Sequence, residues 1–136
     1  MDIRDKYPPE LKTDDGHFVR SKAEMLIDNW LFKNNIPHAY EVSVFLPNNP
    51  DQDLYCDFFL PTYGIYIEYW GLEGDKSYDL RKEQKIELYL NNSLKRIDLD
   101  ESHIKRLNDV LPKILAGDGE QPMDWFRKLK INAKED

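Results

Sequence analysis

Two carboxylates stand in segments where a solvated surface charge is not expected. Asp57 lies inside an aromatic run at 55–59, and Glu68 lies inside a second apolar and aromatic run at 65–70. Burying a carboxylate in such a segment costs free energy unless it is paired or binds a cation. A short turn at 61–64 joins the two runs, so we expect both carboxylates at one end of a hairpin. Two carboxylates and a backbone carbonyl are a sufficient protein contribution to a Mg²⁺ site.

A third acid and a pair of bases extend this candidate site. Glu24 lies beside the apolar stripe of a helical segment and is the candidate third carboxylate. Arg81 and Lys85 are four residues apart on the helical segment that follows Glu68, so they share one helix face. Carboxylates, a divalent ion and a fixed ammonium together are typical of metal-assisted phosphodiester hydrolysis.

The periodicity of apolar residues predicts the elements that position these side chains. Steps of three and four residues predict helices at 19–35, from 75 or 77 to about 90, and at 102–115, where Pro112 is expected to bend or split the helix. Alternation predicts strands at 40–46, 55–60, 65–70 and 94–99. Since a helix separates the last two strands, they can pair in parallel. The expected fold class is α/β, a mixed sheet flanked by helices.

The order of these residues resembles the PD-(D/E)XK nucleases, whose restriction-endonuclease-like fold has an αβββαβ core. More specifically, the chain is similar to a bacterial branch found alone or attached to helicase-like proteins, over roughly residues 15–115. The blocks that carry this resemblance are 15–17 (DGH), 19–24 (VRSKAE), 40–41 (YE), 57–58 (DF), 60–61 (LP) and 64–71 (GIYIEYWG).

The resemblance implies roles for five residues and a substrate. Asp57 and Glu68 would hold Mg²⁺, for which Mn²⁺ could substitute, with the backbone carbonyl of Tyr69 as a further ligand. Glu24 would orient the attacking water or reach a second ion. DNA is the implied substrate, and RNA is not excluded. The family places a lysine two residues after the glutamate, where this chain has Trp70, so Lys85 would supply the ammonium from the helix.

The departure at Trp70 keeps a second hypothesis open: an inactive module of the same fold that binds nucleic acid or a helicase-like or repair partner. A third hypothesis is a structural α/β module in which Asp57 accepts backbone hydrogen bonds and Glu68 is an exposed strand residue. Glu41 could point toward the site or to solvent, and solvent is expected; His38 and His103 are expected to lie at the surface. Phosphate contacts are predicted for Arg20, Lys22, Arg81 and His17, although a turn role for the segment 15–17 is an equal alternative.

Length and charge bound these hypotheses. The chain has 136 residues, which predicts one domain at 17–116 between an irregular lead-in at 1–16 and a tail at 117–136. The net charge is −7, and residues 17–71 hold seven acids against three bases, including all three predicted catalytic carboxylates. We therefore expect weak, salt-sensitive, metal-assisted contact with DNA.

The remaining features concern location and assembly. A single cysteine, Cys56, cannot form an intrachain disulfide, and no run of about 18 apolar residues or signal peptide is present. The chain is therefore expected to be cytoplasmic, without a membrane partner. Many nucleases of the resembled fold act as dimers, so the resemblance allows a dimer here.

Overall fold

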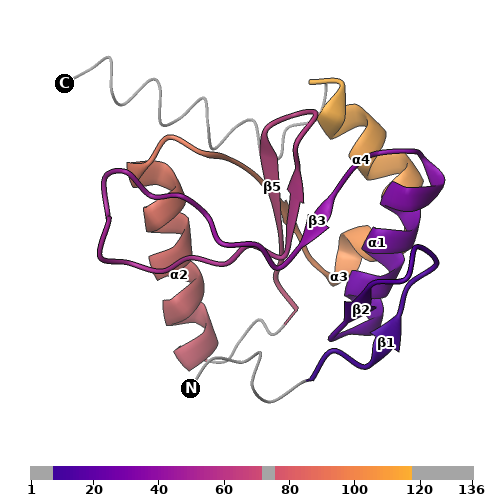
Figure 1. Cartoon of the computed structure of the whole chain (residues 1–136), viewed down its shortest axis with the longest axis horizontal. Coiled ribbons are helices and arrows are strands. Elements are labelled where there is room, and N and C mark those ends of the chain that lie inside the picture. Colours follow the sequence, from indigo (N-terminus) through magenta and orange to yellow (C-terminus); the bar gives the residue numbers. More distant parts are fainter. Residues whose placement is uncertain (1–7, 72–75, 118–136) are drawn as a thin grey trace.

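The computed structural model describes residues 8–71 and 76–117, and a four-stranded mixed sheet lies at its centre (Figure 1). The strand order is β3-β4-β5-β6, with antiparallel pairing of β3 to β4 and of β4 to β5, and parallel pairing of β5 to β6. The strands are β3 (Ala39–Tyr40), β4 (Phe58–Leu60), β5 (Ile65–Tyr69) and β6 (Lys95–Leu99). The predicted α/β class, the mixed sheet and the parallel last pair are confirmed.

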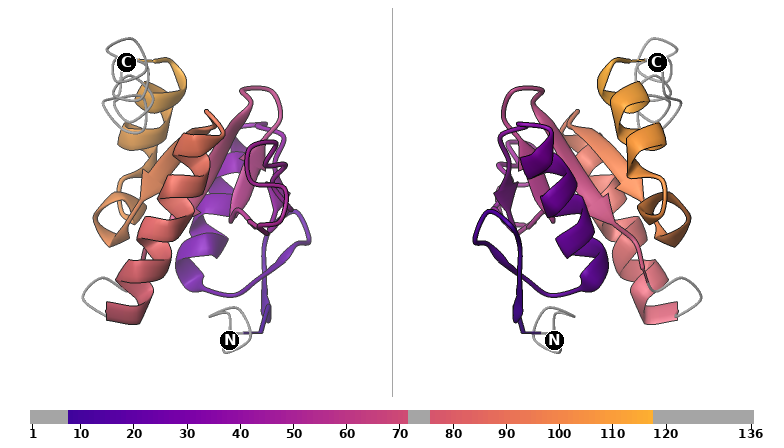
Figure 2. Two further views of the ribbon diagram at one scale, coloured as in Figure 1. Left: turned by 90° about the vertical axis from the view of Figure 1, so that its left-hand side faces the viewer. Right: turned by 90° about the vertical axis from the view of Figure 1, so that its right-hand side faces the viewer.

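Helices cover both faces of this sheet. Figure 1 shows α2 (Lys76–Asn91) on one side of it, and α1 (Lys22–Lys33), α3 (Glu101–Ile104) and α4 (Leu107–Leu115) on the other. The rotated views in Figure 2 place α2 in front of the sheet in one view and α1 in front in the other. A small hairpin, β1 (Leu11–Lys12) with β2 (Phe18–Val19), precedes α1. Among the described residues, no helix is long and apolar enough to cross a membrane.

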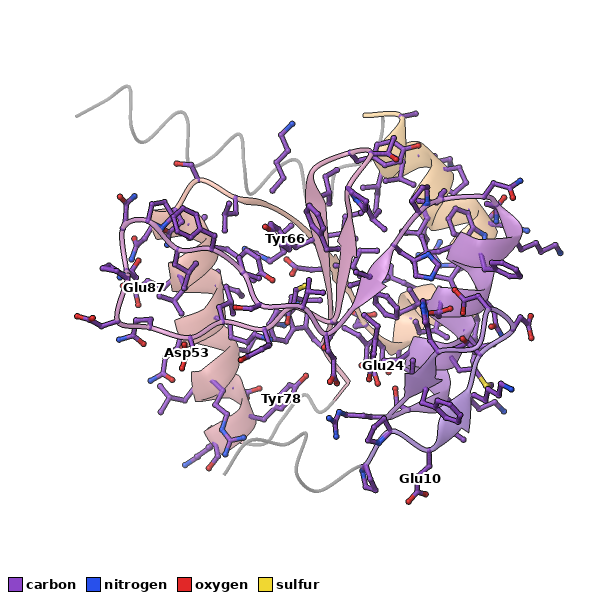
Figure 3. All side chains as sticks on the ribbon, in the orientation of Figure 1. Glu10, Glu24, Asp53, Tyr66, Tyr78 and Glu87 are labelled. Atoms are coloured by element: carbon purple, nitrogen blue, oxygen red, sulfur yellow. The ribbon has the colours of Figure 1, made fainter. Side chains whose placement is uncertain are left out.

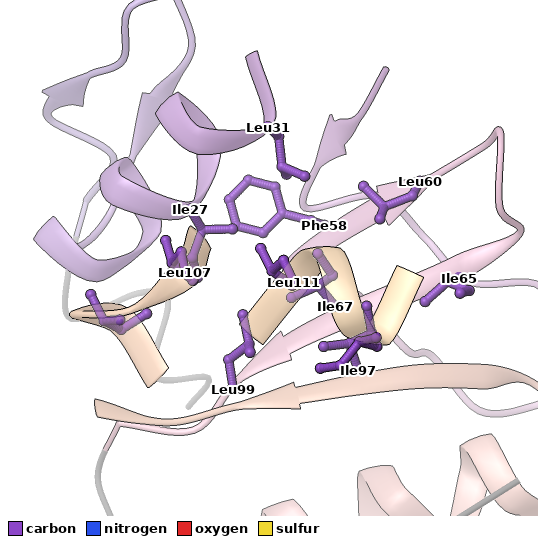
Figure 4. Packing of buried hydrophobic residues seen from close by; sticks show 12 residues of the cluster. Ile27, Leu31, Phe58, Leu60, Ile65, Ile67, Ile97, Leu99, Leu107 and Leu111 are labelled. Carbon is purple, nitrogen blue, oxygen red and sulfur yellow. The ribbon is translucent and has the colours of Figure 1, made fainter. Parts of the chain in front are cut away.

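The alternation of β5 determines what each face of the sheet buries. Ile65 and Ile67 belong to the larger apolar core, which joins the strands to α1, α3 and α4 (Figure 4). The opposite face packs against α2, where Tyr66 contacts a smaller cluster that contains Tyr89. Because successive strand side chains point to opposite faces, Glu68 faces α2. The Glu68 carboxylate therefore lies on the face of the sheet that packs against the smaller apolar cluster.

The prediction of a strand at 40–46 is wrong in extent, because the observed strand β3 covers only Ala39–Tyr40. The strand predicted at 55–60 is observed as the shorter strand β4, Phe58–Leu60. Pairing of β3 with β4 ends where Glu41 takes the left-handed conformation, with φ of 50°. It resumes only as an isolated bridge between Ser43 and Tyr55. A residue in this conformation interrupts the pleat, so the alternation at 40–46 does not form one continuous strand.

The helix predicted at 102–115 also differs, because it breaks at Arg106 and not at Pro112. Arg106 has the non-helical angles φ −141° and ψ 43°, and its carbonyl accepts the N–H groups of Asp109 and Val110, so it begins α4. Pro112 stays inside α4. The expectation that His103 is a free surface residue is wrong, since its Nδ1 accepts the backbone N–H of Asp100 in a capping box at the start of α3.

The ends of the chain are described only in part. Residues 11–12 of the predicted irregular lead-in pair with β2, so this stretch is partly a hairpin. Residues 1–7, the alternative helix start at residue 75, and all of the predicted tail except Gly117 lie outside the described residues.

The conformation of Glu41 gives a stability prediction. A left-handed backbone costs an L-residue about 1–2 kcal/mol and costs glycine little. We expect Glu41→Gly to be more stable than Glu41→Ala by about 1 kcal/mol in urea unfolding, since both remove the same side-chain contacts. At the exposed α2 position Glu83 the order should reverse, with alanine better than glycine. Equal stabilities of the two Glu41 variants would contradict the observed conformation.

Candidate active site

One cavity collects the four residues predicted to be catalytic. Its volume is about 1210 Å³, and Glu24 of α1, Asp57, Glu68 of β5 and Lys85 of α2 all line it. We call it the carboxylate cavity. Figure 3 labels Glu24 on the side of α1, and Tyr78 and Asp53 on the side of α2. Further lining residues that the sequence singled out are Arg20, Glu41, Tyr69, Trp70 and Arg81.

Glu68 is the most buried of the carboxylates that line this cavity, with 1% of its surface exposed. The Lys85 ammonium lies 2.5 Å from Oε1, and the Tyr89 hydroxyl donates a 2.9 Å hydrogen bond to Oε2. Burial and then the charge of Asp57 raise the pKa of Glu68 to about 7, against the lowering effects of Lys85 and Tyr89. The Lys85 ammonium and the Tyr89 hydroxyl thus offset only part of the free-energy cost of burying the Glu68 charge.

Asp57 lies beside Glu68 because of the hairpin register. Phe58 pairs with Ile67, so the residues one step further along, Asp57 and Glu68, lie opposite each other. The backbone N–H of Tyr69 donates a 2.7 Å hydrogen bond to Asp57 Oδ2. The short turn therefore brings the two acids together as expected, and the end of β5 holds the Asp57 carboxylate in place.

Glu24 reaches the same cavity from the first turn of α1. Ser21 caps this helix by accepting the Glu24 N–H at 3.1 Å. Glu24 Oε1 accepts hydrogen bonds from the Ser21 hydroxyl, the Arg20 N–H and the Tyr40 hydroxyl at 3.1–3.2 Å. Burial, followed by the charge of Asp57, raises the pKa of Glu24 to about 7. A side chain that is 7% exposed is therefore oriented by three donors and repelled by a neighbouring acid.

Two of the four predicted phosphate contacts line the cavity, and two lie outside it. Arg20 lines the cavity, with its Nε 2.6 Å from Glu41 Oε1. The expectation that Glu41 faces solvent is wrong, because its side chain is 16% exposed and paired with this guanidinium. Arg81 is exposed at the cavity, whereas Lys22 lies outside it. His17 also lies outside the cavity, against Asp28.

Trp70, two residues after Glu68, packs beside the ammonium groups of Lys82 and Lys85. Its side chain is fixed by a 2.8 Å hydrogen bond from Nε1 to Asp98 Oδ1. The Nζ atoms of Lys82 and Lys85 lie 5.2 Å and 5.7 Å from the ring centroid. A cation in this position is attracted to the face of the indole. Lys85 is thus placed between an aromatic ring and the Glu68 carboxylate.

Two partners of the site were not anticipated from the sequence. Tyr89 is fully buried and binds Glu68, and Asp98 holds Trp70. Tyr89 is four residues after Lys85, so the helical period could have placed both on one face. Asp98 pairs in register with Glu68 across the parallel strands, which the sequence does not reveal.

Comparisons of the chain with family models, with curated proteins and with solved structures found no match.

The raised pKa of Glu24 predicts how a neutral isostere behaves. Its pKa rises from the ordinary 4.5 to about 7 on folding, so the folded state binds this proton more tightly, and stability falls as pH rises from 4.5 to 7. A glutamine side chain carries no charge at either pH and avoids this loss. We expect Glu24→Gln to be more stable than the wild type by about 1–3 kcal/mol at pH 8 and to lose that advantage at pH 5, in urea unfolding with EDTA present.

Glu83→Gln, at an exposed position on α2, is the matched control and should show no such pH-dependent difference. An equal loss of stability in Glu24→Gln at both pH values would contradict the charge repulsion described for the cavity.

Proposed function

We propose that this protein is a metal-dependent nuclease of restriction-endonuclease-like fold that hydrolyses DNA phosphodiester bonds. The observation that carries the proposal is the convergence of Glu24, Asp57, Glu68 and Lys85 on one cavity from separate parts of the chain. The element order α1-β3-β4-β5-α2-β6 supports the same proposal, since it matches an αβββαβ core.

The donor set fits a hard divalent cation. Asp57 and Glu68 offer carboxylate oxygens, and Tyr69, which lines the cavity, would add its backbone carbonyl. Both oxygens of Glu68 already accept a hydrogen bond or ion pair, but each carboxylate oxygen has two lone pairs, so a further partner can be accommodated. The raised pKa of Glu68 also indicates that its charge is incompletely compensated. Bound Mg²⁺ would supply Lewis acidity and an activated water.

The protein side chains have distinct tasks in this proposal. Lys85 would stabilise the negative charge that develops on the phosphate, and its position between Glu68 and Trp70 restricts the ammonium before substrate arrives. Glu24 would orient the attacking water, because three donors fix its Oε1. Arg81, exposed at the cavity, would contact a neighbouring phosphate.

The presence of Trp70 favours one second candidate, a module that binds nucleic acid or a helicase-like or repair partner without cleavage. In such a module the Lys85 ammonium, which is paired with Glu68 and packed on the Trp70 indole, would serve only to neutralise the buried Glu68 carboxylate. Cleavage assays separate the two candidates.

The first assay tests the metal ligands. We expect the full chain to cleave linear duplex, nicked or single-stranded DNA, or RNA, in Mg²⁺ or Mn²⁺ and not in EDTA. Asp57→Asn should lower the rate at least about 100-fold, because it removes a charged ligand of the proposed ion. Asp51→Asn, an exposed change in the preceding loop, should leave the rate unchanged. Binding of these substrates without Asp57-dependent cleavage would reject the nuclease and favour the binding module.

A second assay tests the lysine. Lys85→Ala should lower kcat by about 10²–10³-fold, the usual effect of removing one charge-stabilising donor. Lys82→Ala is the matched control, since Lys82 lies over the same Trp70 ring, whereas the ammonium paired with Glu68 is that of Lys85. The cleavage rate of the Lys82→Ala variant should fall less than about tenfold relative to the wild type. A wild-type rate for a folded Lys85→Ala variant, verified by circular dichroism, would remove Lys85 from the proposed chemistry.

A further inference from the structure

A second cluster of titratable side chains lies outside the carboxylate cavity. Asp15 and His17 come from the turn between β1 and β2, Asp28 from α1, and His38 from the segment before β3. One ligand atom from each residue lies within 4.8 Å of those of the other three. We call this group the His/Asp cluster. The prediction that His38 is a surface residue is wrong, since its side chain is 4% exposed.

Four distances between histidine nitrogens and carboxylate oxygens in the His/Asp cluster are close to those around a tetrahedral ion. His17 Nδ1 lies 2.9 Å from Asp28 Oδ2 and 3.3 Å from Asp15 Oδ2. His38 Nε2 lies 3.0 Å and 3.2 Å from Asp15 Oδ2 and Asp28 Oδ2 respectively. Four ligands held about 2.0–2.1 Å from a Zn²⁺ ion would be separated by about 3.3 Å. Four of the six ligand–ligand distances are therefore already within a few tenths of an ångström of that value, and all six lie within 4.8 Å.

Hydrogen bonding gives an independent indication that a cation belongs here. His38 Nδ1 lies 2.8 Å from the Ile36 carbonyl, which can only accept, so Nδ1 carries a proton. His38 Nε2 faces two carboxylate oxygens, so it binds either a proton, as in the imidazolium, or a metal ion in the proton's place. Within the described residues, Asp28 Oδ1 is buried without a hydrogen-bond partner, and Asp28 is completely buried. A ring fixed through its other nitrogen by a carbonyl is typical of a metal-binding histidine.

We propose that Asp15, His17, Asp28 and His38 bind one Zn²⁺ ion in a closed structural site. Two imidazole nitrogens and two carboxylate oxygens suit a borderline transition-metal ion, whereas Mg²⁺ favours oxygen ligands alone. With four protein donors no position is left for substrate, so the ion acts by connecting segments. It joins the β1–β2 turn to α1 and to the start of β3. This proposal does not depend on the nuclease proposal.

The site lies close enough to the carboxylate cavity to support it. Asp28 is one helical turn after Glu24 on α1, and the two residues that follow β2 are Arg20 and Ser21, which donate to Glu24. The β1–β2 turn is also attached to α1 by a 2.8 Å hydrogen bond from the Asp14 N–H to Asn29 Oδ1. Zn²⁺ at the His/Asp cluster would therefore fix the segment that orients Glu24.

The test measures metal binding by the full chain. After removal of metal with a chelator, the wild type should bind one equivalent of Zn²⁺ in a titration against a chromophoric competitor, and Co²⁺ in its place should give the visible absorption of a tetrahedral site. His38→Ala and His17→Ala should each weaken Zn²⁺ binding by about 100-fold or more. His17 is the variant that keeps the test interpretable if His38→Ala fails to fold, because its side chain is 39% exposed.

Two controls separate this site from the carboxylate cavity and from adventitious binding. His103→Ala removes a histidine outside the cluster, and Asp57→Asn removes a carboxylate of the cavity; both should bind Zn²⁺ like the wild type. Failure of the wild type to bind one equivalent would overturn the proposal, as would Zn²⁺ affinity unchanged in His17→Ala. Loss of Zn²⁺ binding in Asp57→Asn alone would assign the ion to the cavity and overturn it equally.

Discussion

The burial of the Glu68 charge is the constraint on which the α2 side of this structure depends. The carboxylate lies in the face of the sheet, so its partners must come from the element that covers that face. Lys85 and Tyr89 meet this need, and their four-residue separation places both on one side of α2. Tyr89 is also the one buried residue among those described in this helix. Helix α2 thus contributes both polar contacts and apolar packing to this face of the sheet.

The fold was predictable where local periodicity and packing agree. The alternation at 65–70 and 94–99 and the apolar stripe of α1 correspond to β5, β6 and a capped helix. Prediction failed at Glu41, whose left-handed conformation is not favoured by its residue type, and at Arg106, where one helix gives way to the next. Both failures occur where a tertiary contact or a chain reversal outweighs local preference.

The candidate site was predictable to a different extent. The meeting of Asp57 with Glu68 follows from a short turn, and the position of Lys85 agrees with the helical period. The pairing of Arg20 with Glu41 and the enclosure of His38 join residues about twenty positions apart, which no local pattern reveals. Asp28 did leave a signal, because it is one turn from Glu24 and directly follows the buried Ile27. A charge within an apolar stripe indicates a buried partner.

Helix α1 contributes one residue to the carboxylate cavity and one to the His/Asp cluster, and the two sites offer different donor atoms. Glu24 joins a cavity whose carboxylates and backbone carbonyl supply oxygen atoms, whereas Asp28, one turn later, joins two imidazoles. Hard cations favour the first set, and borderline transition metals favour the second. Two proposed sites that share a helix would therefore select different ions and would not compete for one. Part of the net charge of −7 then comes from the carboxylates of these two proposed sites, which bound cations would neutralise.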